Sequence, residues 1–114
     1  MRVEVKVLLR NQVSLPETAV CRVEVRDVSL LDAPSITICS HQAPATKISG
    51  ISLLTEMLEV PDNDLVGRNL NVWAHLSLTG SKRVQSGDYI TMQAYPIRAT
   101  VSAVSVAVEL QPVR

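Results

Sequence analysis

The sequence is poor in aromatic residues and has no excess of either charge. Its 114 residues include one Trp, two Tyr and no Phe, and its 11 Lys and Arg residues are balanced by 11 Asp and Glu residues. A protein that binds nucleic acid needs a basic surface, and one that binds single strands also stacks bases on aromatic rings. The composition therefore argues against nucleic acid as a partner.

Cysteine, glycine and long apolar runs are also scarce. Two Cys are too few for a disulfide framework or for a zinc site of their own, and the four isolated Gly form no phosphate-binding loop. No stretch approaches the roughly 18 apolar residues of a transmembrane helix, and the residues after Met1 do not form the apolar segment of a signal peptide. We expect no cofactor and no transmembrane segment.

The sequence does contain many aliphatic residues, which alternate with polar ones. Hydrophobic residues make up 46% of the chain, and Val, Ile and Leu at every second position are typical of half-buried strands. Residues 48–60 fit this pattern less well, because their apolar residues also fit one face of a helix; we interpret them as a strand. The expected strands cover residues 2–9, 21–27, 36–41, 48–60, 70–78, 89–95 and 101–110.

About seven short strands separated by turn residues predict an all-β fold. We expect residues 1–114 to form a single domain, an antiparallel β-sandwich in which the first two strands are neighbours. A small closed barrel is the alternative, because the alternation does not show how the edges of the sheet are protected.

His75 is the first candidate for chemistry. It alternates onto the same face of its strand as Trp73, and Asp88 or Ser86 would lie near it if the chain folds back after Gly80. A nucleophile, a base and an orienting group would all have to be within hydrogen-bonding reach, and no nucleophile-elbow motif is present. We therefore predict no catalytic residues: His75 is interpreted as an exposed strand histidine, and Trp73 with His75 as an interaction surface.

Thiol and imidazole ligands suggest a metal site only weakly. The alternation places Cys39 and His41 on the face opposite Ile36, whereas Cys21 is in phase with the buried Val23. Ligands on different faces do not converge, and a disulfide between the two cysteines is disfavoured for the same reason. We expect Cys21 to be a free thiol in the core, and we predict no metal site.

The loop after residue 26 carries two carboxylates and a hydroxyl, at Asp27, Ser29 and Asp32, and Pro34 follows. The spacing lacks the alternating oxygen ligands and central Gly of a calcium loop, so side chains that bond back to loop amides explain it better.

The same residues carry a family resemblance. The run Asp27-Val28-Ser29, two further residues and then Asp32-Ala33-Pro34 resembles the signature of the YbaY/YscW family of small bacterial lipoproteins. The run from Leu70 to Leu76 and the element Tyr95-Pro96-Ile97 are similar to its second half. The resemblance implies a β-sandwich and a non-enzymatic binding or assembly protein. It suggests a pilotin-like chaperone that binds the C-terminal tail of an outer-membrane secretin, with Asp27, Ser29, Asp32 and Pro34 as signature positions in a structural turn.

Family members carry a signal peptide and a lipidated cysteine before the first strand, whereas Met1 opens that strand here. Two locations follow: a lipoprotein anchored at the outer membrane on its periplasmic side, if a leader precedes Met1 in the natural gene, or a leaderless relative in the cytoplasm. A homodimer is a further expectation, because zero net charge and Val-rich edges favour self-association. The alternative functions are a small-ligand or metal-binding β domain and a self-associating structural domain.

Overall fold

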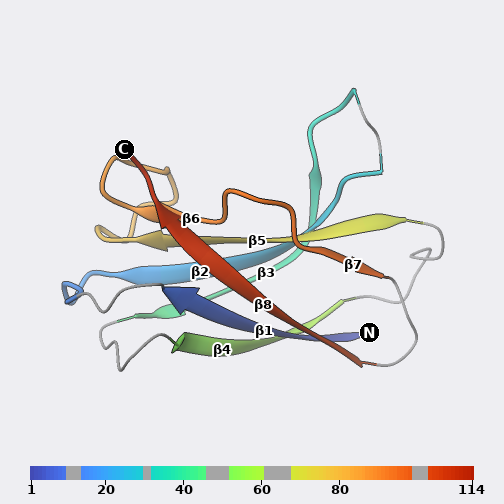
Figure 1. The fold of residues 1–114 in the computed structure, drawn as a ribbon, viewed down its shortest axis with the longest axis horizontal. Helices are drawn as coiled ribbons and strands as arrows, with labels where there is room; N and C mark the ends of the chain where they lie inside the picture. Colours follow the sequence, from blue (N-terminus) through green and yellow to red (C-terminus); the bar gives the residue numbers. More distant parts are fainter. Residues whose placement is uncertain (10–13, 30–31, 46–51, 61–67, 99–102) are drawn as a thin grey trace.

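The computed structural model describes residues 1–9, 14–29, 32–45, 52–60, 68–98 and 103–114. These residues include eight strands (Figure 1). The strands are β1 (Arg2–Leu9), β2 (Val20–Asp27), β3 (Ile36–Pro44), β4 (Ser52–Glu59), β5 (Asn69–Ser77), β6 (Tyr89–Ile90), β7 (Pro96–Arg98) and β8 (Ala103–Pro112). Within these ranges no helix is long and apolar enough to cross a membrane.

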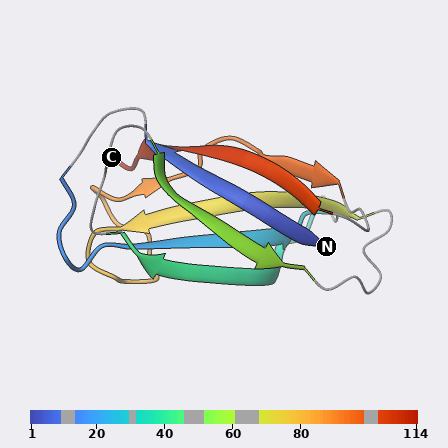
Figure 2. The ribbon, with the colours of Figure 1, turned by 90° about the horizontal axis from the view of Figure 1, so that it is seen from below.

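The strands form one continuous sheet that curls on itself. Their order is β3-β2-β5-β6-β8-β1-β4, with β7 paired to β5 outside this path. All pairs are antiparallel except β1 with β8, which run parallel. The end strands β3 and β4 approach each other without pairing among the described residues, so the sheet is a nearly closed barrel (Figure 2). The all-β prediction is confirmed, in the form of the barrel alternative.

The core consists of the aliphatic residues that the alternation predicts. Every second residue of β1, β2 and β5 faces inward, and Val3, Val5 and Val7 are completely buried. Burying one such side chain contributes about 1.5–3 kcal/mol relative to leaving it exposed. The inward-facing apolar residues of these three strands are Val3, Val5, Val7, Leu9, Cys21, Val23, Val25, Leu70, Val72, Ala74 and Leu76.

The predicted pairing of the first two strands is wrong. β1 lies between β4 and β8, whereas β2 lies between β3 and β5. Both edges of each strand are therefore occupied by other partners, and the alternation that identified the strands carries no information about which partner each one takes. The ambiguous stretch at 48–60 is a strand over Ser52–Glu59, and its residues 48–51 lie outside the described residues.

Of the predicted strand at 89–95 only β6, Tyr89–Ile90, is formed, and the next strand, β7, begins beyond it at Pro96. Between them, side chains supply hydrogen bonds that a continuous ladder would have made. Thr91 Oγ1 accepts a bond from the Ala74 amide at 3.3 Å, and Asn71 Oδ1 accepts one from the Tyr95 amide at 2.6 Å. The chain therefore stays beside β5 while leaving strand geometry for several residues.

Candidate functional site

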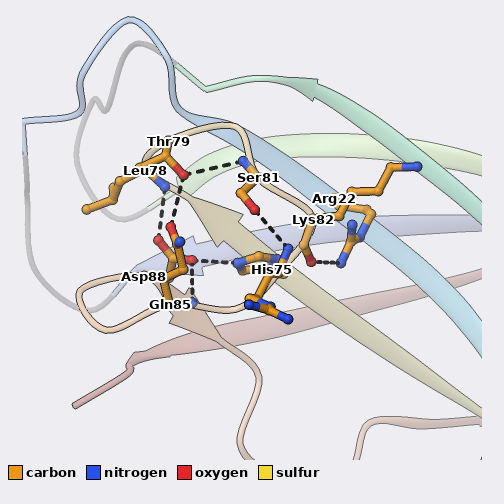
Figure 3. A network of polar contacts seen from close by, with 9 residues as sticks. Arg22, His75, Leu78, Thr79, Ser81, Lys82, Gln85 and Asp88 are labelled. Atoms are coloured by element: carbon orange, nitrogen blue, oxygen red, sulfur yellow. Dashed lines mark hydrogen bonds and ion pairs between the residues drawn. The ribbon is translucent and has the colours of Figure 1, made fainter.

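The loop between β5 and β6, residues 78–88, is held down by one buried carboxylate. Asp88 is 1% exposed, and its Oδ1 accepts a hydrogen bond from the Leu78 amide at 3.1 Å. Its Oδ2 accepts a bond from the Gln85 amide at 3.0 Å and lies 2.8 Å from His75 Nε2 (Figure 3). Three donors, one from β5 and two from the loop, thus converge on the Asp88 carboxylate.

Asp88 remains ionised despite its burial. Burial raises the pKa of Asp88, but the hydrogen bonds from His75 and from the Leu78 and Gln85 amides outweigh this effect. The resulting pKa lies below the ordinary value of 3.8. The charged form is therefore the one that the loop is built around.

His75 is enclosed beneath this loop. The prediction that Asp88 lies near His75 is confirmed, but the expectation of an exposed histidine is wrong, because His75 is 0% exposed. Its Nδ1 makes no hydrogen bond among the described residues, and Ser86 lies on the exposed side of the loop. Among the described residues no hydroxyl or thiol hydrogen-bonds to the His75 ring, so the relay considered from the sequence is not assembled.

Trp73 lies beside His75 on the same outer face and is only partly buried. Its ring packs between two guanidinium groups: Arg26 Cζ lies 4.0 Å and Arg22 Cζ 5.4 Å from the ring centroid. Glu24 joins these arginines, with Oε1 accepting a bond from Arg26 Nε at 2.9 Å and Oε2 lying 3.1 Å from Arg22 Nε. Of the predicted interaction surface only Trp73 is presented to solvent, and its role in binding stays a prediction.

The signature loop lies at the other end of β2 and β5. Asp27 Oδ1 accepts a bond from the Ser29 amide at 2.9 Å, which forms an Asx turn, and Oδ2 accepts one from Arg68 Nη1 at 2.6 Å. Ser29 Oγ accepts a bond from the Asn69 amide at 2.9 Å. The hydrogen bonds from Ser29, and then that from Arg68, hold the pKa of Asp27 below its ordinary value. Asp27 and Ser29 therefore tie the end of β2 to the start of β5.

A pocket of about 350 Å³ opens beside this loop. The register pairs Asp27 with Ile36 on one side and with Leu70 on the other, so these side chains share the inward side of the sheet. The pocket therefore lies at a mouth of the barrel. Its lining residues are Asp27, Ser29, Pro34, Ile36 and Arg68.

Three of the five pocket residues belong to the signature noticed in the sequence, and two were missed. Ile36 is 59% exposed, whereas the sequence indicated only that it belongs to the strand predicted at 36–41. Arg68 lies 41 positions from its partner Asp27, and nothing local in the sequence indicates that pairing. Asp32, the remaining carboxylate of the signature, is exposed and does not line the pocket.

Neither cysteine forms a disulfide, and Cys21 is completely buried in the core as predicted. The predicted opposite orientation of Cys39 is wrong, because a register irregularity between Val25 and Arg26 lets Ile36 and Cys39 both oppose inward-facing residues of β2. Cys39 pairs with Val25, four positions from Cys21, which separates the two Cα atoms along the strand by about 13 Å. That span is too long for a disulfide, and no group of three metal-ligating side chains occurs in the described ranges.

Comparison with known proteins adds a family to this geometry. Residues 1–108 match the family described as type III secretion system lipoprotein chaperone (YscW), which confirms the resemblance seen in the sequence. The structure is similar to that of an alternative pilotin from the type II secretion system of Vibrio cholerae, with a TM-score of 0.80 and 23% identity over 100% of this chain and 97% of that one. That likeness shows a shared fold. No curated protein sequence matches the chain.

Proposed function

Because the chain belongs to the YscW family of type III secretion system lipoprotein chaperones, we propose that it is a non-enzymatic chaperone that binds the C-terminal tail of an outer-membrane secretin. The observation that carries this proposal is the extent of the family match, which covers residues 1–108. The match includes every strand of the barrel except the end of β8. The family relationship therefore applies to the fold as a whole.

The geometry supports binding rather than catalysis. His75, the residue closest to a catalytic role in the sequence, is sealed beneath the 78–88 loop and salt-bridged to Asp88 when protonated. Features open to a partner among the described residues include the pocket at the mouth of the barrel and β3, where most residues are exposed. Both are suited to a polypeptide segment.

The proposal is tested by titrating the purified chain with the C-terminal tail of the source organism's secretin in a calorimeter. We expect saturable binding with one tail per chain, and no binding of a tail with the same composition in scrambled order. In cells, loss of the gene should leave the secretin unassembled, and expression of the chain should restore assembly. A tail that does not bind, together with normal secretin assembly in the deletion strain, would contradict the proposal.

A further inference from the structure

Arg68 brings a guanidinium group to the wall of the pocket beside the signature loop. Its Nη1 bonds Asp27 Oδ2 at 2.6 Å, and its side chain is 45% exposed, so the group is open to solvent. Asp27 is fixed in turn by the Ser29 amide, which donates to its Oδ1 at 2.9 Å. Both oxygens of Asp27 thus accept a hydrogen bond already, and Asp27 holds a cationic donor group in a defined position at the pocket.

The wall of the same pocket also has an apolar part. Pro34 and Ile36 line it, and Ile36 is 59% exposed although its side chain is large and aliphatic. Covering such a side chain stabilises a complex, because apolar surface is removed from water. A ligand that uses both parts of the wall therefore combines an anionic group with an apolar one.

The size of the pocket limits what part of a polypeptide it holds. Its volume of about 350 Å³ lies near the lower end of the roughly 300–1,000 Å³ that is usual for ligand pockets. Such a space suits one or two residues. The end of a chain fits best, because a terminal residue enters a pocket without the chain having to leave it again.

We propose that the pocket binds the C-terminal residue of the partner chain, whose carboxylate accepts hydrogen bonds from Arg68 and whose apolar side chain covers Ile36. The identification of that chain with the secretin tail rests on the proposed function. A C-terminal residue carries the anionic and the apolar group together, whereas an acidic residue inside a chain has no apolar side chain of its own. A cation is disfavoured, because it would meet the Arg68 guanidinium beside a carboxylate that is already bonded.

Calorimetric titration with the secretin tail as the free acid and as the C-terminal amide tests the carboxylate. Amidation should weaken binding at least about tenfold, because a charge-assisted hydrogen bond is lost. Arg68→Gln should weaken binding of the free acid by a similar factor and leave binding of the amide nearly unchanged, a pattern that a loss of stability alone does not produce. Arg83→Gln removes the same charge from the exposed part of the 78–88 loop and should bind both peptides like the wild type.

A smaller probe tests the pocket without the tail. N-acetyl-leucine at millimolar concentration should shift the backbone amide signals of Ser29 and Ile36 in NMR spectra of the wild type, and N-acetyl-leucinamide should not. Equal affinity for the acid and amide tails, or an equal loss of both in Arg68→Gln, would overturn the carboxylate site and leave the proposed function intact. Shifts with N-acetyl-leucine but no binding of either tail would overturn the proposed function alone, and the absence of both would overturn both.

Discussion

Asp88 and Asp27 lie at opposite ends of β5. They show how burial changes the role of a carboxylate that accepts hydrogen bonds from the backbone and from one side chain. Each carboxylate accepts hydrogen bonds from backbone N–H groups, one at Asp27 and two at Asp88, and each also pairs with one nitrogen-containing side chain, Arg68 or His75. At Asp88 both partners are enclosed, with side-chain exposures of 0% and 2%, whereas the Arg68 side chain is 45% exposed. The buried pair fixes a loop, and the open pair forms the wall of a pocket.

The largest loss of stability is expected at the buried carboxylate, Asp88. Replacing Asp88 by Ala leaves His75 Nε2 and the Leu78 and Gln85 amides without their acceptor, and we expect a loss of about 3 kcal/mol in the free energy of unfolding. Urea denaturation measures this loss. Asp27→Ala should cost clearly less, because water reaches its partner, and the exposed Asp32→Ala should cost almost nothing. Equal losses at Asp88 and Asp27 would show that burial does not separate the two sites.

Acid and salt sharpen the comparison further. Both carboxylates have a folded-state pKa below the ordinary 3.8, so each stabilises the fold above that value and loses its contribution as the pH falls through the folded-state pKa. The free energy of unfolding should therefore fall below pH 3.8, and less steeply in Asp88→Asn and in Asp27→Asn than in the wild type.

Salt should distinguish the two variants in the same measurement, because screening weakens exposed charge pairs more than buried ones. At neutral pH, added salt should reduce the difference between Asp27→Asn and the wild type and leave that between Asp88→Asn and the wild type unchanged. If salt reduced the stability difference between Asp88→Asn and the wild type, water would have access to the pair of Asp88 and His75.

The smallest loss of stability is expected in the middle of β5, where Trp73 packs against arginine side chains. Arg26→Ala removes the closer of the two guanidinium groups from the ring, together with its hydrogen bond to Glu24, and should cost about 1 kcal/mol. Arg26→Lys keeps the charge and should recover part of that loss. The single tryptophan reports both unfolding and the change in its surroundings by fluorescence. An Arg26→Ala variant with unchanged stability would show that neither the ring contact nor the bond to Glu24 contributes to stability.

The sequence predicted the parts of this molecule that depend on local alternation. The phases of β1, β2, β5 and β8 follow from residues such as Val5 and Val108, because burial of one face imposes a period of two. The orientation of Cys39 failed because one irregular position in β3 reverses every face after it. The burial of His75 failed because its cover comes from a loop, which alternation within β5 does not describe.

The candidate site was predictable to a similar degree. The signature motif identified Asp27, Ser29 and Pro34, since these residues lie close together in the chain. Arg68 and the exposed Ile36 became part of the pocket only through the pairing of β2 with β3 and β5. The place of β3 at one end of the strand order was also hidden in the sequence, because alternation does not show which strands pair.

The parallel pairing of β1 with β8 has a consequence for how the chain reaches this structure. It brings Glu4 and Ser105, 101 positions apart, to within 3.4 Å, and it places β1 between one strand from the middle of the sequence and one from its end. Contacts between such distant segments slow folding, because a long loop must close before any burial compensates. While β8 is still being synthesised, the valines of β1 lack their cover, and in that interval the chain itself needs protection from aggregation.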